Sequence, residues 1–364
     1  MYLIFFVLPI ILLIPVSIYI FFFIKRIILC FYKKELPMWM QGIIAFISLM
    51  CIYPARNLFG FWALIILHFF ACGLVVDIIF YILKKKNINQ LEKLHHIGII
   101  PLVCVAMILG YGYLNMKDVN GKYYDILTEK EISQSYRIAL ITDLHFGNTM
   151  NNEELKKYCQ EISKEKPDIV LLGGDIVDER STRQQVIDAF ALLGQIDSQY
   201  GIYYVYGNHD RGTYSQNADF TETDLEDAIT HHGVQILSDE QVAVTDDLII
   251  IGREDRGHVE RKSSSELFQT VDQDDFLLIF DHQPVDLNVN DELGYDLQLS
   301  GHTHGGQVFP VGLITDLLGF GEMNYGYRQL QHMQVVVSSG IAGWGYPVRT
   351  GSHSEYVIIN VKRI

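Results

Sequence analysis

Almost all of the long apolar stretches in this chain lie before Met116, and this placement limits its architecture more than any other feature. Four apolar runs can be distinguished: Tyr2 to Ile24, Met38 to Tyr53, Leu58 to Leu83 and Ile97 to Leu114. A helix needs about 20 predominantly apolar residues to cross the hydrocarbon core of a bilayer. The first, third and fourth runs meet that length closely, and the second is shorter. We therefore predict an anchor of about four transmembrane helices over residues 1–116.

The basic residues between these runs predict the orientation of the anchor. Lys and Arg residues follow the first and third runs, whereas only Arg56 lies between the second and third. Because cytoplasmic loops carry an excess of Lys and Arg, these two loops are placed in the cytoplasm. The first run has no basic leader and no small-residue cleavage pattern, so we interpret it as a retained helix and not a signal peptide. Four spans then give a multi-pass protein of the cell membrane with an extracytoplasmic C-terminal domain. If the second run does not span, that domain is cytoplasmic.

One acidic residue, Asp77, lies inside the third apolar run, with His68 nearer the middle of that run. Ionisable groups at membrane depth are functional candidates, so a transporter that uses Asp77 is one alternative. However, Asp77 is close to the lysines that follow the run and can pair with one of them. Few other polar residues line these runs, and an anchor remains the favoured interpretation.

The charge is distributed very differently in the two parts of the chain. Residues through Met116 contain nine basic and three acidic residues, whereas the remainder contains 19 basic and 40 acidic residues. A strongly acidic domain repels polyphosphate backbones, which argues against a nucleic-acid polymer as partner. Only one of the five cysteines, Cys159, lies in the polar part, so this part can form no disulfide framework and contains no Cys-x-x-Cys zinc pattern.

From Tyr136 onward the pattern changes to strands that alternate first with helices and then with one another. The polar segment 117–135 reads as a connector, and 136–364 as one domain. Helices are predicted over Asn151–Lys164, Gln184–Leu193 and Glu222–His232. Strands are predicted over Tyr136–Thr142, Asp168–Leu172, Ile202–Tyr206, Val234–Leu237, Gln241–Thr245, Leu248–Gly252, Phe276–Phe280, Asp296–Leu299, Gln334–Ser338 and Tyr356–Val361. This order indicates an α/β fold of layered sheets flanked by helices.

Five groups of polar residues lie in this domain, most of them directly after a predicted strand. They are Asp143 with His145, Asp175, Asn208 with His209, His282, and His302 with His304. Loops beyond the carboxyl ends of strands are where binding sites gather. Each pair taken alone is ordinary turn or capping chemistry. Together, carboxylates that converge at strand ends are costly unless neutralised, and bound cations would supply that charge. The mixture of oxygen and imidazole ligands suits Mn, Fe or Zn.

These motifs, in this order, resemble the calcineurin-like metallophosphoesterases. The resemblance rests on Asp143-Leu144-His145, Gly174-Asp175-Ile176-Val177-Asp178, Gly207-Asn208-His209-Asp210, His282 and Gly301-His302-Thr303-His304. It extends over the whole polar part of the chain. The following Gly305-Gly306-Gln307 is similar to a bacterial, membrane-anchored branch of the family. The resemblance implies a sandwich of two β-sheets flanked by helices, with two divalent metal ions at one edge.

The resemblance also implies a role for each residue. Asp143, His145 and His304 would bind the first metal, and Asn208, His282 and His302 the second. Asp175 would bridge the two. His209 matches the family's catalytic histidine, with Asp210 orienting it. A hydroxide that bridges the two metals would attack phosphorus, as in other two-metal sites. We expect a phosphodiesterase with manganese among the candidate metals, acting on phospholipid-like or lipid-linked phosphate esters.

Several alternatives remain open at this stage. The domain is either this phosphodiesterase, a phosphomonoesterase or nucleotidase of the same chemistry, or a non-catalytic membrane receptor or sensor that retains the fold. Arg211 and Arg349 are possible phosphate contacts, but the favoured interpretation of each is an ordinary surface or structural arginine, so neither is included in the predicted site. The segment from Gly312 to Gln331 is rich in Gly, Leu and aromatic residues. It reads either as a packed loop or as an apolar lip that admits a lipid tail.

Overall fold

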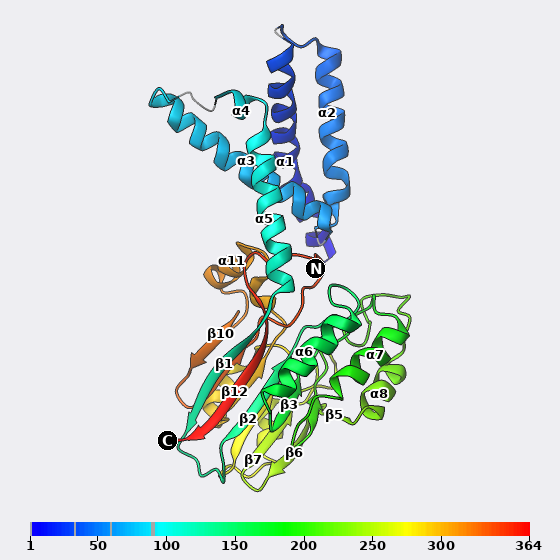
Figure 1. Ribbon diagram of the computed structural model, residues 1–364, viewed down its shortest axis with the longest axis vertical. Helices are drawn as coiled ribbons and strands as arrows, with labels where there is room; N and C mark the ends of the chain where they lie inside the picture. The colour runs from blue at the N-terminus through cyan, green and yellow to red at the C-terminus, as the bar shows by residue number, and fades with distance from the viewer. Residues whose placement is uncertain (1, 33, 59, 89–91) are drawn as a thin grey trace. The chain divides into compact units, whose positions relative to one another are not determined.

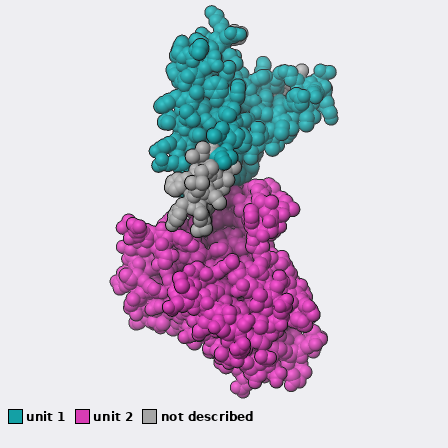
Figure 2. Space-filling model, turned by 180° about the vertical axis from the view of Figure 1, so that it is seen from behind, with its two compact units in different colours: residues 1–112 teal, residues 113–364 magenta. Residues whose placement is uncertain are grey.

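The computed structural model describes the chain except residues 1, 33, 59 and 89–91, and the side chains of residues 2–10 and 12. The chain divides into two compact units, Met1–Gly112 and Tyr113–Ile364 (Figure 2). The first unit contains the apolar runs and the second contains the polar motifs. Each unit is described separately below.

The first unit is built from long apolar helices. Its elements are α1 (Tyr2–Phe31), α2 (Met38–Ile52), η1 (Tyr53–Arg56), α3 (Phe61–Lys85), α4 (Glu92–His96) and α5 (Ile99–Lys117), the last of which ends in the second unit. Four stretches are long and apolar enough to cross a membrane: Leu13–Phe31, Met38–Arg56, Phe61–Lys85 and Ile99–Lys117. The second of them, which looked short in the sequence, gains length because η1 continues α2. The prediction of four apolar N-terminal helices is confirmed.

Asp77 lies in a polar cluster inside this unit. Its carboxylate accepts hydrogen bonds from Arg26 Nη1 at 2.5 Å and Tyr19 Oη at 2.9 Å, and lies 2.7 Å from His95 Nε2. Carboxylates at membrane depth are costly unless they are paired. The pairing of Asp77 therefore agrees with a structural role in holding α1, α3 and α4 together.

The second unit contains two six-stranded sheets. The first has the order β1 (Val119–Thr128), β12 (Ser354–Arg363), β2 (Tyr136–Ile141), β3 (Ile169–Leu172), β4 (Ile202–Tyr204) and β5 (Val234–Ile236). The second has the order β10 (Gly326–Gln329), β11 (Gln334–Val337), β9 (Leu297–Ser300), β8 (Phe276–Phe280), β7 (Leu248–Gly252) and β6 (Glu240–Thr245). Strands β2 to β5 pair in parallel, and so do β7, β8, β9 and β11. The carboxyl ends of the parallel strands in each sheet thus lie along one edge of it.

Helices cover both sheets and complete the layers. An apolar cluster between the sheets contains Leu140, Leu171, Leu278 and Leu299, all fully buried. Helices α6 (Asn152–Lys164), α7 (Arg183–Leu193) and α8 (Glu222–His231) pack on the other face of the first sheet (Figure 1). The shorter α9 (Ser264–Phe268) and α10 (Leu287–Leu293) contribute to the apolar cluster on the other face of the second sheet. The predicted two-sheet sandwich flanked by helices is confirmed.

Two segments differ from the sequence prediction. The expected connector, 117–135, contains β1, a ten-residue strand that pairs in parallel with β12. It was missed because polar residues occupy several of its exposed positions and its partner is at the other end of the chain. The expected loop from Gly312 to Gln331 contains most of α11 (Val311–Leu318) and all of β10. Neither element was predicted, because the glycines and aromatic residues of this segment suggested a loop.

Candidate metal centre

Three of the polar motifs follow adjacent parallel strands of the first sheet. Asp143 and His145 follow β2, Asp175 follows β3, and Asn208 follows β4. The second sheet supplies His282 after β8, and His302 and His304 after β9. The two sets meet because each comes from the carboxyl edge of its sheet.

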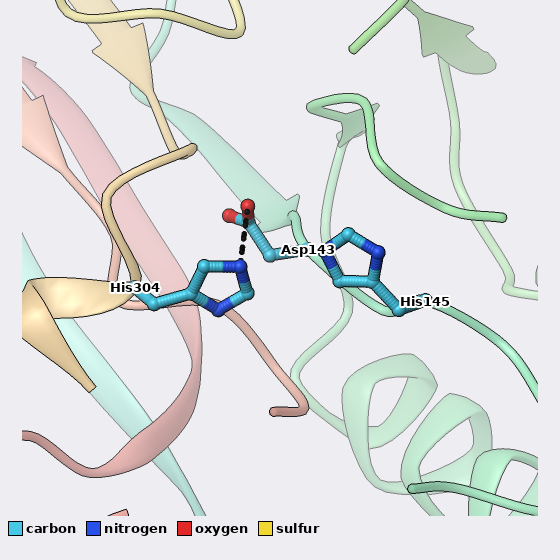
Figure 3. Close-up of side chains that lie close together, drawn as sticks. All are labelled: Asp143, His145 and His304. Atoms are coloured by element: carbon cyan, nitrogen blue, oxygen red, sulfur yellow. Dashed lines mark ion pairs between the residues drawn. The ribbon is translucent and has the colours of Figure 1, made fainter. Parts of the chain in front are cut away.

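Three of these side chains form a first cluster. Ligand atoms of Asp143, His145 and His304 lie within 4.8 Å of one another. The Nε2 atom of His304 lies 3.5 Å from Asp143 Oδ1, and the rings of His145 and His304 stack with centroids 5.3 Å apart. Figure 3 shows the Asp143 carboxylate and the His145 and His304 rings gathered at the end of β2. This is the trio expected to hold the first metal.

Asp175, His282 and His302 form a second cluster, with ligand atoms also within 4.8 Å of one another. His282 Nε2 lies 3.2 Å from Asp175 Oδ2 and 3.2 Å from His302 Nδ1. The same Oδ2 atom of Asp175 lies 3.7 Å from His145 Nε2 in the first cluster. Asp175 therefore stands between the two clusters, where a ligand shared by two metals would have to be.

Several polar atoms at this centre have no hydrogen-bond partner among the described residues. They are the two ring nitrogens of His145 and the Oδ1 atom of Asn208, all buried. Buried polar atoms are nearly always hydrogen-bonded, and each exception needs an explanation. Lone pairs of an imidazole and an amide are ligands for divalent transition metals. The residues present therefore fit two divalent cations.

The backbone at the centre is unusual. Five of the seven predicted ligands have positive φ angles between 42° and 71°: Asp143, His145, Asp175, His302 and His304. Such a conformation costs a residue other than glycine about 1 kcal/mol or more, and it clusters at functional sites. Gly174 and Gly207 allow the strand ends to approach, because a Cβ atom on Gly207 would lie 2.3 Å from the Asp175 amide nitrogen. The ligand geometry is thus maintained against local conformational preference.

Neighbouring groups hold the histidines in place. His282 Nδ1 lies 2.7 Å from the Gly173 carbonyl oxygen, so it carries a proton and leaves Nε2 free for a ligand role. The Asp178 carboxylate lies 3.4 Å from His145 Nδ1. Burial works to raise the pKa of Asp175, but His282, His145 and His209 outweigh it and hold that pKa well below its ordinary value. Asp175 is therefore an anion, as a bridging ligand must be.

The His209 side chain lies at the rim of the centre. Its Nδ1 atom is 2.9 Å from Glu179 Oε2, and its backbone N–H donates to Asp175 Oδ1 at 2.8 Å. Burial lowers the pKa of His209, yet the hydrogen bond to Glu179 and the nearby carboxylates more than compensate and raise it. Glu179 was not singled out in the sequence. Its only local signal is its place directly after Asp178, since its contact to His209 spans 30 residues.

The role expected for Asp210 is wrong. Its two oxygens accept hydrogen bonds from the backbone N–H groups of Asp175, Ile176, Val177 and Gly207, at 2.7 to 3.1 Å. The residue that contacts the His209 ring is Glu179 instead. Burial, with the negative charge of Asp175, raises the pKa of Asp210 to about 6. Asp210 therefore fixes the loops after β3 and β4 to each other.

Both arginines singled out in the sequence have structural partners. Arg349 is fully buried and donates to the carbonyl oxygens of Ser339 and Ala342 at 2.5 Å, with Nη2 also 3.3 Å from His304 Nδ1. Arg211 pairs with Glu254 at 2.7 Å and lies over the Tyr206 ring. These contacts agree with a structural role for both arginines.

A family model confirms what these motifs indicated. The model of the calcineurin-like phosphoesterases matches residues 136–306, from the start of β2 to the end of η2 (His304–Gly306). This region of the chain is a calcineurin-like phosphoesterase domain. The matched region contains both ligand clusters, and metal binding and phosphoester chemistry are the family's properties. The phosphoesterase domain is thus one part of the chain, and the apolar helices are another.

Relatives of known sequence include membrane proteins. An uncharacterised metallophosphoesterase of Campylobacter jejuni is 26% identical over 285 residues, which cover 77% of this chain and 73% of that protein. A transmembrane protein with a metallophosphoesterase domain from Danio rerio is 25% identical over 354 residues, or 87% of this chain and 77% of that protein. A solved dimetal phosphatase from Danio rerio aligns with a TM-score of 0.37 and 12% identity, over 56% of this chain and 87% of that one. The four apolar helices and the transmembrane relative together make this phosphoesterase a membrane-associated protein.

Proposed function

We propose that this phosphoesterase is a membrane-anchored hydrolase that uses two divalent metal ions to cleave phosphate esters, with phosphodiesters of lipid-like or lipid-linked compounds as its substrates. The observation that carries this proposal is the position of Asp175 between two clusters of Asp and His side chains. A receptor that had lost catalysis would have no reason to retain every one of these groups in a strained backbone.

Each metal ion would have its own set of ligands. Asp143, His145 and His304 would hold the first, and Asn208, His282 and His302 the second, with Asp175 shared. The mixture of carboxylate, amide and imidazole groups suits Mn, Fe or Zn. When bound, two such ions would lower the pKa of a bound water and stabilise negative charge on the phosphate oxygens. The negative charge of Asp175 is the protein's contribution to holding both.

His209 would supply the proton for the leaving oxygen. Its contact with Glu179 uses Nδ1, so Nε2 is the ring nitrogen available to substrate. Its backbone bond to Asp175 fixes the residue beside the shared ligand. General acid catalysis by a positioned group of this kind contributes about 10²–10⁴-fold. Glu179 is a positioning residue, since it acts through His209.

The membrane anchor and the negative charge of the domain restrict the range of possible substrates. Residues after Met116 carry 40 acidic and 19 basic residues, so long polyanions such as nucleic acids are repelled. The basic loops after the first and third spans favour a multi-pass topology with the phosphoesterase domain outside the cell. A site tethered at a membrane surface meets lipid-linked phosphate esters at high local concentration. A cysteine introduced at Ser215 tests the topology, because an impermeant maleimide would label it on intact cells only if the domain is outside.

The experiment that tests catalysis is hydrolysis of bis-p-nitrophenyl phosphate and p-nitrophenyl phosphate by the full chain in detergent. Assays would contain Mn, Zn, Fe or no metal, and would compare Asp175→Asn and His209→Ala with the parent protein. The exposed residues Asp274 and His231 provide matched controls, Asp274→Asn and His231→Ala. We expect metal-dependent turnover of the diester that both site variants lose and both controls keep.

Other outcomes would overturn parts of the proposal. Turnover of the monoester alone would indicate a phosphomonoesterase of the same chemistry. Metal binding without turnover of either compound would favour a receptor or sensor that retains the fold. Turnover that persists in Asp175→Asn would place the reaction outside the two clusters.

A further inference from the structure

The segment that follows the last ligand motif exposes a patch of large apolar side chains. Every residue of α11 is described and none is buried. Leu317 is 75% exposed and Phe320 is 67% exposed. We define the apolar lip as the exposed large apolar residues in and beside this helix: Phe309, Val311, Leu313, Ile314, Leu317, Leu318 and Phe320. Contiguous exposed apolar residues on a folded domain mark a surface that binds a partner or a membrane.

The apolar lip is joined directly to the candidate metal centre. It begins five residues after His304. The turn that carries His304 is also bonded to the chain four residues beyond the lip, because Thr303 Oγ1 donates to the Asn324 carbonyl oxygen at 2.5 Å. The backbones of Gly306 and Gly312 are in contact, since a Cβ atom on Gly306 would lie 2.3 Å from the Gly312 Cα. The lip therefore cannot move far from the ligands of the first cluster.

The same region is bonded to the end of a candidate membrane span. Helix α5 forms the candidate membrane span Ile99–Lys117 and ends at Lys117. Near that end, Asn115 Nδ2 donates to the carbonyl oxygens of Arg349 at 3.0 Å and Ser352 at 2.8 Å. Ser354 Oγ donates to the Met116 carbonyl oxygen at 2.7 Å. The segment 349–354 is thus bonded to the last residues of α5.

A second set of contacts joins this segment to the N-terminal end of the apolar lip. The backbone N–H groups of Thr350 and Gly351 donate to the Gln307 carbonyl oxygen at 2.9 and 3.0 Å. The Phe309 N–H donates to Thr350 Oγ1 at 3.0 Å. One short run of contacts therefore leads from the end of α5 through 349–354 to the lip. Only these two sets of hydrogen bonds separate the lip from the last residues of α5 in the described part of the chain.

We infer that the apolar lip inserts into the interfacial layer of the bilayer, beside the metal centre, and that the phosphate ester reaches the site from the membrane. This inference deepens the proposed function and rests on it for the substrate. The segment 303–327 contains no Lys or Arg, and its acidic residues are Asp316 and Glu322. Insertion would therefore depend on apolar burial, and not on attraction to anionic headgroups.

The depth of the lip can be measured without any assay of catalysis. In the full chain, the five cysteines would be replaced by alanine and a single cysteine introduced by Leu317→Cys, labelled with a polarity-sensitive fluorophore. Val259, which is 98% exposed in the same domain, provides the matched control Val259→Cys. Both proteins would be placed in nanodiscs of phosphatidylcholine with a quencher on the acyl chains. We expect strong quenching at position 317 and little at 259, with no change when anionic lipid is added.

Two results of this measurement would overturn the inference. Equal, weak quenching at 317 and 259 would show that the lip is in water. A label at 317 that avoids the lipid quencher but becomes protected as the protein concentration rises would show that a second copy of the chain covers the lip instead.

The effect on substrate access is tested with the double variant Leu317→Glu/Leu318→Glu and the control Val259→Glu. We expect the double variant to lose about tenfold or more of its turnover of a headgroup-labelled phospholipid in vesicles, since charged residues cannot insert as leucines do. Its turnover of soluble bis-p-nitrophenyl phosphate should stay at the level of the parent protein. An equal loss on both substrates would overturn the inference, because the lip would then only support the fold of the centre. A parent protein inactive on both substrates would refute the proposed function, and the depth measurement would decide the lip alone.

Discussion

The two edges of the phosphoesterase sandwich are formed by opposite ends of the same strands, and they differ in the hydrogen bonding of their polar groups. At the amino edge, Lys130 Nζ donates to the carbonyl oxygens of Gln273 and Asp275 and to Asp296 Oδ2, at 2.6 to 2.9 Å. Beside it, Asp247 accepts from Thr245 Oγ1 at 2.6 Å and from the Tyr136 hydroxyl. These charged and polar groups are paired within the domain.

At the carboxyl edge, the same fold leaves polar atoms without partners. Both ring nitrogens of His145 and the Oδ1 atom of Asn208 are buried and accept or donate no hydrogen bond in the described part of the chain. Positive φ angles accumulate there as well. Single unpaired atoms also occur elsewhere in the domain, such as Arg137 Nε and Asn290 Oδ1, but at the carboxyl edge they coincide with the two clusters of Asp and His side chains. Their position beside these clusters agrees with a site that binds cations. The amino edge should therefore matter for stability, and the carboxyl edge for metal binding and catalysis.

Asp210 is the exception at the carboxyl edge, and its removal should have the largest effect. Its carboxylate is fully buried and serves four backbone N–H groups. We expect Asp210→Ala to lower the free energy of unfolding by about 3 kcal/mol or more, because several buried donors lose their acceptor. Thermal unfolding of the full chain in detergent would measure this. A variant as stable as the parent protein but inactive would instead return Asp210 to the orienting role.

Glu179 should show the reverse pattern, with a large effect on turnover and a small one on stability. We expect Glu179→Gln to lower kcat by about 10–10²-fold at nearly unchanged KM, since an amide no longer fixes the His209 ring as a carboxylate does. The loss should be greater for a diester with a poor alkyl leaving group than for a nitrophenyl ester, because a poor leaving group depends more on the proton from His209. A loss that is equal for both leaving groups would contradict a positioning role. Glu153, exposed at the start of α6, provides the control Glu153→Gln.

The sequence was sufficient to identify the candidate metal ligands, but not the contacts of the residues that position them. Asp143, Asp175 and His302 were predictable because the carboxyl ends of parallel strands meet at one edge, so residues far apart in the chain converge. Glu179 was missed because side-chain pairing across 30 residues leaves no local pattern. The motif of Asp210 was recognised, yet its adjacency to His209 suggested a contact with the imidazole, whereas its carboxylate accepts from backbone N–H groups.

The fold followed the same rule. Strands with continuous apolar residues, such as β3 and β8, were predicted to within one residue. Strand β1 was missed because only one of its faces packs against the sandwich, and its polar positions resemble a linker. Helix α11 was missed because its apolar residues have no core to face, so the usual reading of an apolar stretch failed. The proposed insertion of the apolar lip into the bilayer would account for this composition.

Lys130 tests the stabilising role of the amino edge. We expect Lys130→Met to lower the free energy of unfolding by about 2 kcal/mol, since the partly buried Asp296 loses its cation and two carbonyl oxygens lose their donor. The kcat for bis-p-nitrophenyl phosphate should remain that of the parent protein. Lys156, exposed on α6, provides the control Lys156→Met. A loss of turnover without a loss of stability would show that the two edges are coupled, which would contradict the comparison.

The smallest effect is expected from the pH dependence at Asp247. Burial works to raise the pKa of Asp247, but hydrogen bonds from Thr245, Tyr136 and Ser133 outweigh it and lower that pKa to about 2. The unfolded value is about 3.9, so the ionised carboxylate stabilises the folded state above that pH and loses its effect as the pH falls toward 2. The contribution should be below about 1 kcal/mol because the side chain is partly exposed.

The matching measurement compares the melting temperatures of Asp247→Asn and the parent protein between pH 6 and pH 3. The difference between them should be greatest at pH 6 and should shrink as the pH falls through 4, since protonation makes the parent carboxyl resemble the amide. The neighbouring exposed residue provides the control Asp246→Asn, which should show no such trend. A difference that grows toward acid pH would mean that Asp247 is protonated in the folded state. The hydrogen bonds around Asp247 would then not stabilise an ionised carboxylate at the amino edge.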